Sequence, residues 1–142
     1  MASKAEAVMV AVLARLQASP AIADNVRRAH RIPITREQAP AVHLIDGTDT
    51  PTPAKNNCRT QRTRAFTVSI FVRDDTGASA ADPYVLAVND ALDPGTGTAY
   101  PGNAIMRQGR ITVDEEIADG DAVRVDMAFE FDYQTAGWAL DV

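Results

Sequence analysis

The chain has 142 residues, 46% hydrophobic and 23% charged, and this balance predicts one globular domain with a single core. We expect no signal peptide, because the N-terminus has no basic region followed by an unbroken apolar stretch. We expect no membrane helix, because no stretch approaches the ~20 apolar residues that one needs. Cys58 is the only cysteine, which excludes an intrachain disulfide and favours a reducing compartment such as a cytoplasm. Residues 1–73 hold eleven Lys or Arg against five acids, whereas residues 74–142 hold three against fourteen. Unless the two halves interleave in space, such a molecule can dock on a copy of itself or touch a polyanion on one side.

A first helix is predicted over about residues 5–18. Ser3 and Glu6 have the spacing of a capping box at its start, and Pro20 ends it because proline cannot continue the hydrogen-bond ladder. The apolar residues between them recur at helical spacing: Val8, Met9, Val12, Leu13 and Leu16.

The next part of the chain predicts little regular structure. Segment 25–38 is basic and contains a proline, so at most a short or edge strand fits there. A short apolar run over residues 41–45 predicts a strand closed by an Asp-Gly turn. Residues 48–61 have no apolar period and contain two prolines, so a long loop is predicted over about residues 46–62.

The middle of the chain alternates between strand and helix signals. Strict apolar–polar alternation over residues 64–73 predicts a strand. A second helix is expected from about residue 79 to an Asp-Pro-Gly stop at residues 93–95. A loop rich in Gly and Pro then runs to residue 102, and a strand is expected over residues 104–113.

The last strand, residues 123–133, has the clearest alternation in the sequence. One of its faces is apolar throughout: Val123, Val125, Met127, Phe129, Phe131 and Tyr133. An extension over about residues 134–142 follows and contains Trp138, the only tryptophan, so we expect this segment to need a surface to dock on. Together these elements predict an α+β fold: a single domain over residues 1–142 with a largely antiparallel, mixed sheet of four to five strands and two helices packed on one face.

No pattern predicts a catalytic residue, a metal or a cofactor. The possible soft ligands His30, His43 and Cys58 match no zinc spacing, and Cys58 lies in the polar loop without an oriented base. The acids of residues 114–121 lack the spacing of a calcium loop and indicate a solvated hairpin end. The glycines of residues 95–102 leave a helix and enter a strand, which is the reverse of a phosphate-binding loop.

Charged clusters are the remaining candidates for a functional surface. Three acids share the polar face of the last strand, but no specific spacing supports an acid–base pair: Asp126, Glu130 and Asp132. Two basic clusters could contact a phosphate backbone or the acidic half of a neighbouring copy: Arg27, Arg28, Arg31 and Arg36, then Arg59, Arg62 and Arg64. No aromatic residues are interleaved with these arginines, so sequence-specific nucleic-acid binding is not expected and the neighbouring copy is preferred.

The order of these elements is characteristic. An amphipathic helix and a short basic stretch lead into residues 40–45, an arginine begins the strand of residues 64–72, and a helix starts at residues 80–82. A strand containing glycine and a closing strand that ends in Phe-Glu-Phe-Asp-Tyr, residues 129–133, complete the order. Over about residues 5–133 the chain resembles the tail terminator and tail completion proteins of long-tailed bacteriophages.

The resemblance implies an assembly role and no enzymatic activity. Proteins of this kind form a six-membered ring on the last ring of tail tube subunits, stop polymerisation and offer the surface to which the filled head attaches. The implied partners are copies of the chain itself, the tail tube protein and a head–tail connector or neck protein, with DNA passing non-specifically through the lumen and no membrane. The implied location is the head-proximal end of the virion tail, after assembly in the host cytoplasm.

Two sets of residues are expected to serve this role. The first is expected at the interface with the next subunit or the tube: Arg59, Arg62, Arg64 and Phe71. The second is expected to face the lumen, where carboxylates repel the DNA backbone: Asp126, Glu130 and Asp132. Two other classes stay open, a neck or connector protein that joins head to tail without setting tail length, and a small ligand-binding or enzymatic α+β domain.

Overall fold

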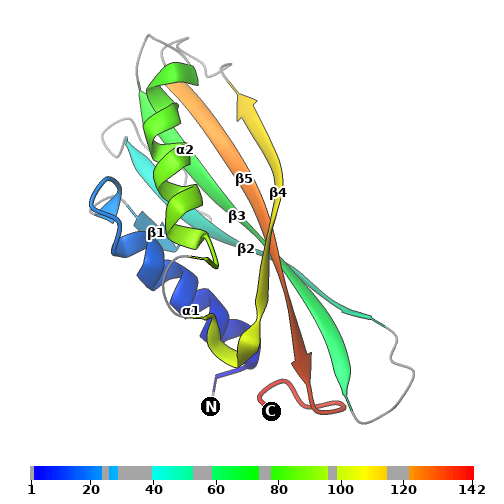
Figure 1. Ribbon diagram of the computed structural model, residues 1–142. Coiled ribbons are helices and arrows are strands. Elements are labelled where there is room, and N and C mark those ends of the chain that lie inside the picture. The colour runs from blue at the N-terminus through cyan, green and yellow to red at the C-terminus, as the bar shows by residue number, and fades with distance from the viewer. Residues whose placement is uncertain are drawn as a thin grey trace.

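In the residues that it describes, the computed structural model has two α-helices and five strands (Figure 1). It describes residues 2–23, 26–28, 40–52, 59–73, 78–95, 99–114 and 122–142. The helices are α1 (Lys4–Gln17) and α2 (Ala78–Leu92), with a 3-10 turn, η3 (Pro101–Asn103), before β4. The strands are β1 (Val26–Arg28), β2 (Ala41–Thr52), β3 (Thr60–Arg73), β4 (Ile105–Asp114) and β5 (Ala122–Thr135).

The strands form one five-stranded sheet in the order β1-β2-β3-β5-β4. Only the short β1 runs parallel to its neighbour, β2, and every other pairing is antiparallel. Both helices lie on the same face of the sheet and leave the other face open (Figure 1). The α+β prediction, with a mixed sheet and two helices on one face, is therefore confirmed.

The core lies between the helices and the covered face of the sheet. Alternation on β3 and β5 supplies a group of aromatic rings, and Phe66 stacks on Phe129 with ring centroids 5.5 Å apart. α1 contributes fully buried residues at helical spacing: Val8, Met9, Val12 and Leu16. The expected helix start is also present, because the Ser3 hydroxyl accepts a 3.1 Å hydrogen bond from the Glu6 backbone N–H.

The long loop predicted over residues 46–62 is wrong for most of its length. β2 continues to Thr52 and β3 begins at Thr60, so only residues 53–58 of that prediction lie outside the described residues. The register shifts between Asp46 and Asp49, which breaks the apolar period while the pairing with β3 continues. Pro51 is tolerated because no described strand lies on the other side of this part of β2.

Gly47 allows β2 and β3 to approach each other at this irregularity. A Cβ added there would lie 2.6 Å from the backbone carbonyl oxygen of Ala65 on β3. We expect Gly47→Ala to lower the free energy of unfolding by about 1–3 kcal/mol, because a backbone atom of a paired strand cannot move aside cheaply. Denaturant unfolding measures this loss. Gly95→Ala is the control, since its Cβ would meet only the flexible Asp93 carboxylate at 3.2 Å, and an equal loss in both variants would contradict the explanation.

Candidate functional site

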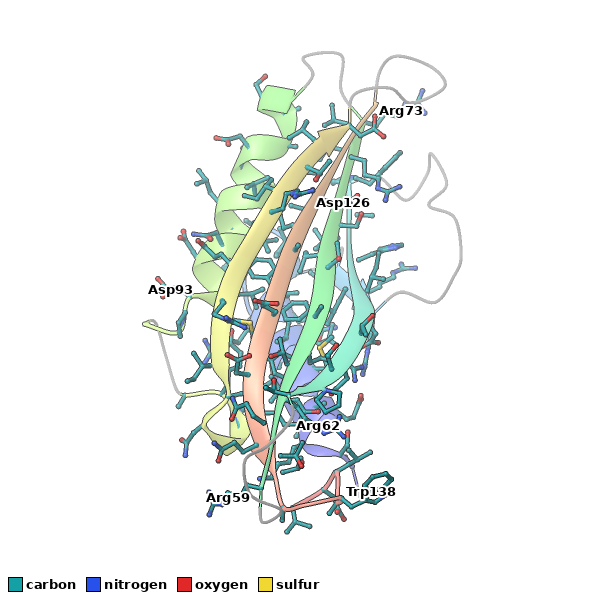
Figure 2. All side chains as sticks on the ribbon, turned by 90° about the vertical axis from the view of Figure 1, so that its right-hand side faces the viewer. Arg59, Arg62, Arg73, Asp93, Asp126 and Trp138 are labelled. Atoms are coloured by element: carbon teal, nitrogen blue, oxygen red, sulfur yellow. The ribbon has the colours of Figure 1, made fainter. Side chains whose placement is uncertain are left out.

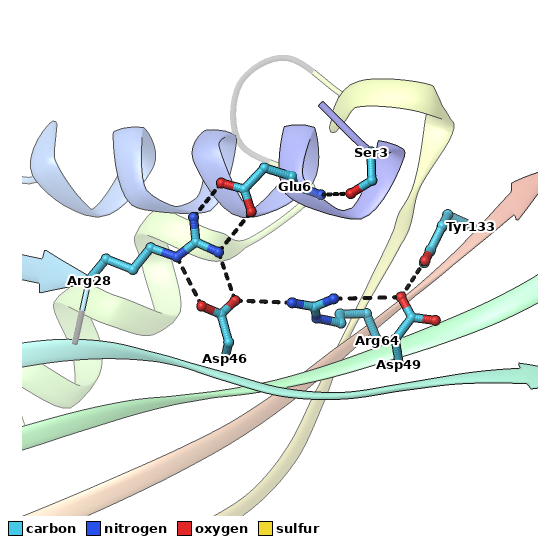
Figure 3. A network of polar contacts seen from close by, with 7 residues as sticks. All are labelled: Ser3, Glu6, Arg28, Asp46, Asp49, Arg64 and Tyr133. Carbon is cyan, nitrogen blue, oxygen red and sulfur yellow. Dashed lines mark hydrogen bonds and ion pairs between the residues drawn. The ribbon is translucent and has the colours of Figure 1, made fainter. Parts of the chain in front are cut away.

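A network of charged side chains ties the start of α1 to the sheet (Figure 3). Its centre is Arg28 on the short strand β1. The Arg28 guanidinium donates to both carboxylate oxygens of Glu6 in α1, at 2.5 and 2.9 Å, and to both oxygens of Asp46 in β2, at 3.0 and 2.9 Å. Two bidentate contacts hold this three-residue strand against a helix and a strand at once.

The same network continues along β2 and β3. Arg64 donates to Asp46 at 3.2 Å and lies 3.7 Å from a carboxylate oxygen of Asp49. Arg62 also reaches Asp49, at 3.1 Å, and the Tyr133 hydroxyl of β5 donates to that carboxylate. The network therefore joins elements from both ends of the sequence, and its three arginines balance its three carboxylates.

The pKa values follow from these contacts. Hydrogen bonds from Arg28 hold the pKa of Glu6 below its usual value, and the bonds to Glu6 and Asp46 raise the pKa of Arg28. Burial raises the pKa of Asp46, but the hydrogen bonds from Arg28 and Arg64 outweigh it, so the net pKa is lowered. Burial and the hydrogen bond to Asp49 raise the pKa of Tyr133. All of these groups keep their ordinary charge near neutral pH, which indicates a structural network.

The arginines expected at an interface are placed differently from one another. Arg62 and Arg64 belong to the network, and their side chains are only 20% and 21% exposed. The Nε atom of each is buried without a hydrogen-bond acceptor among the described residues. Arg59 is exposed at the end of the molecule and donates to the Gln134 side chain at 3.4 Å. Phe71 lies half-buried in register between β2 and β5, on the open face of the sheet.

The three acids of β5 share the open face of the sheet, and each is paired with an arginine of that face (Figure 2 labels Asp126). Asp126 pairs with Arg124 at 2.9 Å. Arg107 on β4 contacts both Glu130 and Asp132, at 2.9 Å each. These five groups are three carboxylates and two guanidinium groups. By register Asp114, Arg27 and Arg73 lie on the same face, so the described open face as a whole is close to neutral.

Asp126 is held most firmly of the three. It accepts a 2.5 Å hydrogen bond from the Ser69 hydroxyl on β3, in addition to its contacts with Arg124. Burial raises the pKa of Asp126, but the hydrogen bonds from Arg124 and Ser69 outweigh it, so the pKa is below its usual value. The carboxylate is therefore ionised at neutral pH.

β4 is an exposed edge of the sheet. Among the described strands it pairs only with β5, so its other side has no neighbour, and almost all of its residues are exposed. Ile105, on the open face, is 63% exposed; Ile111 and Val113, on the helix side, are 53% and 50% exposed. Natural proteins usually protect edges of this kind, so this strand with its exposed apolar residues is a candidate contact surface.

The end of the chain folds back as a clip, residues 136–142, against the start of the chain. The Lys4 backbone N–H donates to the Leu140 carbonyl at 2.9 Å, and the Thr60 hydroxyl donates to the Gly137 carbonyl at 2.7 Å. The predicted docking surface for this extension is thus the beginning of α1 and of β3. The sequence identified the extension but not that the clip would leave Trp138 outside the core, 98% exposed.

Among the described residues no group of three His, Cys, Asp or Glu side chains could hold a metal ion, and no helix is long and apolar enough to span a membrane. His43 is described, and burial and nearby Arg27 lower its pKa. His30, Cys58 and the acidic run after Asp114 lie outside the described residues.

The comparisons with known proteins define a fold. No protein-family model matches the chain, and no curated protein matches it. Among solved structures, a chain of the virion of the native gene transfer agent (GTA) particle is similar, with a TM-score of 0.68 and 19% sequence identity. The match covers 92% of this chain and 97% of that chain. This protein therefore shares its fold, over nearly its whole length, with a chain of a virion particle.

Proposed function

We propose that this protein is a structural virion protein without enzymatic activity, a tail terminator. It forms a ring that caps the tail tube, ends tail polymerisation and provides the surface for head attachment. The observation that carries the proposal is a sheet with two open edges that run in opposite directions, on a fold shared with a virion chain. The resemblance to tail terminators implies that this ring has six subunits.

The two edges explain how a ring can close. In the described part of the chain, β4 has no neighbour on its outer side, and β1 pairs only with Val42–Leu44 of β2, which leaves residues 45–52 without a neighbour. Three antiparallel steps separate β2 from β4, so these strands run in opposite directions. β4 of one copy can therefore continue into β2 of the next as an antiparallel ladder. Repeating this one contact by rotation gives a head-to-tail ring.

Such a ring turns the open face of the sheet toward the lumen and keeps the helices outside. The acids Asp126, Glu130 and Asp132 then line the channel, with Arg107 and Arg124 balancing part of their charge. The carboxylates along β5 repel phosphate, which opposes adhesion of passing DNA. A density map of the assembled ring with this face packed on another protein would exclude the lumen position.

The expected interface residues take different parts in this proposal. Arg59, exposed at the end of the molecule, contacts acids of the tube or of the next copy. Arg62 and Arg64 act indirectly, because their pairing with Asp46 and Asp49 shapes the end of the β2–β3 pair. Phe71 lies on the face assigned to the lumen. The proposed partners are thus other copies, the tail tube protein and a connector or neck protein, at the head-proximal end of a tail assembled in the host cytoplasm.

The test is electron microscopy of lysates in which this reading frame is disrupted, with the intact gene supplied in trans as the control. We expect overlong tubes beside filled heads without tails, because nothing stops growth or joins the head. Unattached tails of normal length would instead indicate a neck or connector protein. Normal infectious particles would exclude an assembly role and favour a ligand-binding or enzymatic domain.

A further inference from the structure

The two edges of the sheet that are unpaired in the described part of the chain carry the same irregularity. These free edges are the outer side of β4 and residues 45–52 of β2. On β2, two residues between Asp46 and Asp49 lie opposite one residue of β3. On β4, two residues between Gln108 and Ile111 lie opposite one residue of β5. Each irregularity is a β-bulge, which adds one residue to an edge strand and bends it.

A bulge changes the face to which the following side chains point. In a regular strand the side chains alternate, so residues three apart lie on opposite faces of the sheet. Asp46 and Asp49 are three apart, yet both pair with helix-side residues of β3. Gln108 and Ile111 likewise both pair with helix-side residues of β5. A regular strand added to either edge would match the faces on one side of the bulge and oppose them on the other. A partner strand therefore needs a bulge of its own.

Each free edge supplies the bulge that the other needs. When β4 of one copy lies antiparallel to β2 of the next copy with the bulges side by side, residues 105–112 fall opposite residues 45–52. The two segments are equal in length, and their faces match on both sides of the bulge. Two pairs of open-face residues then mark the ends of the ladder: Ile105 with Thr52, and Thr112 with Ile45.

The charges favour this pairing over the pairing of either strand with its own copy. If β2 met β2 with the bulges matched, Asp46 would face Asp49, and if β4 met β4, two Arg110 side chains would lie at one bulge. Like charges in opposite positions are destabilising. Pairing β4 with β2 avoids both. It also brings Asp114, at the end of β4, to the level of Arg27 on β1 of the next copy, so opposite charges meet on the open face.

We propose that β4 of one copy pairs with residues 45–52 of β2 in the next copy in a single register, which the two bulges fix. The inference rests on the proposed ring and adds which residues meet across the contact between its subunits. A slip of two residues would move the bulges out of line and oppose the faces between them. The bulges thus select both the partner strand and its register.

Two details of the ladder follow from this register. Pro51 has no backbone N–H, so the ladder has at most one hydrogen bond fewer than a regular pair of strands. Ile111 comes opposite Asp46 of the next copy, and arginines of that copy already donate to both oxygens of the carboxylate. A cation introduced at position 111 therefore finds no free acceptor there.

Deleting one residue from each bulge tests the match between them. Without Arg110, β4 is a regular strand and keeps its pairs with β5 on both sides, and without Thr48, β2 is regular against β3 in the same way. In sedimentation of the purified full chain, we expect each single deletion to weaken association about 30-fold, because the faces then oppose each other on one side of the remaining bulge. The double deletion removes both bulges and should restore association to within about threefold of the wild type.

Substitutions at the same two positions separate the loss of a bulge from the loss of a side chain. Arg110→Ala and Thr48→Ala keep the bulges and should associate as the wild type does. Thermal unfolding shows which variants are folded. A folded double deletion that associates no better than the single deletions would overturn the match between the bulges.

Cysteine pairs locate the register in assembled particles and do not depend on the deletions. Cys58→Ser is the background, because Cys58 is the only cysteine. The two cysteines of a pair lie in one chain on strands that β3 and β5 separate, roughly 14 Å apart, which is too far for a disulfide within the chain. After oxidation we expect covalent multimers of the chain from two pairs: Ile105→Cys with Thr52→Cys, and Thr112→Cys with Ile45→Cys.

Two further pairs, both with Ile105→Cys, are the controls. Thr50→Cys is shifted by two residues, about 7 Å along the strand, and should give no link. Asp114→Cys would form a link only if β4 paired with β4 of another copy, and its products would stop at dimers. A link in either control pair, or the absence of a link in either expected pair, would overturn the register.

These outcomes differ from those that test the terminator role. The cysteine variants are supplied in trans to lysates in which the reading frame is disrupted, so tail length and cross-linking are read from the same particles. Tails of normal length joined to heads, without links at the expected pairs, would overturn the register and leave the tail terminator proposal standing. Links at both expected pairs, with tails of uncontrolled length, would support the register and reject the terminator role.

Discussion

Replacing Ile111 with lysine is expected to leave a folded chain that no longer closes into a ring. Ile111 is 53% exposed on β4, the strand that the proposal pairs with β2 of the next copy. Association would bury an ammonium group without a partner beside a strand edge, and lysine at edges is the device by which proteins prevent such pairing. We expect association to weaken by about 3 kcal/mol or more, at least a hundredfold. Sedimentation velocity and negative-stain microscopy measure the loss of rings.

The chain offers a closely matched control for this change. Val10 on α1 is 54% exposed and does not lie at a sheet edge, so Val10→Lys adds the same charge at the same exposure. The free energy of unfolding of both variants should lie within about 0.5 kcal/mol of the wild-type value, as is usual for substitutions of exposed residues. If Ile111→Lys formed rings at the same concentrations as Val10→Lys, β4 would not be part of the interface.

The second large effect is expected from Arg28, the centre of the charged network. Arg28→Gln removes the partner of Glu6 and one of the two arginines that contact Asp46, and it releases β1, which pairs with β2 through only three residues. Because the groups are partly exposed, we expect a loss of about 2 kcal/mol, less than for a fully buried pair. A loss of this size lowers the midpoint of thermal unfolding by about 6 °C. Arg27→Gln, on the exposed face of the same strand, is the control and should change little.

The stability difference between the wild type and Arg28→Gln is expected to depend on pH. Glu6 and Asp46 have folded-state pKa values below their unfolded values, so the unfolded chain binds more protons and these groups add stability that is complete above about pH 5. That stability is lost as the pH falls through their folded pKa values. The difference between wild type and Arg28→Gln should therefore shrink toward low pH. A difference that stayed constant from pH 7 to pH 3 would show that Arg28 acts through packing alone.

Strong periodic patterns in the sequence led to correct elements. The alternation of β5 and β3 identified both buried faces, and the capping box at Ser3 located the start of α1. These predictions succeeded because each depends on neighbours a few residues apart, which the sequence displays directly. The short edge strand allowed in the basic segment 25–38 is present as β1, Val26–Arg28, and residues 29–38 of that segment lie outside the described residues.

The candidate site could be predicted only in part. The polar alternation of β5 placed its three acids together on one face, as found. It could not show that Arg107, on the neighbouring strand, pairs with two of them, because that contact depends on the register of β4 against β5. The interface role expected for Arg62 and Arg64 likewise stays a proposal, since their closest partners are acids of β2 that the sequence had placed in a loop.

The sequence by itself determined the fold class, the order of helices and strands and the buried face of each main element, because apolar periodicity is local and burial follows it. Only the tertiary structure decided the extent of β2, where a register shift and a proline hide a strand from periodicity. It also decided the network around Arg28, the unpaired edge of β4 and the exposure of Trp138. Each of these depends on which residues distant in sequence become neighbours, and that choice is made by the packing of the whole chain rather than by any segment of it.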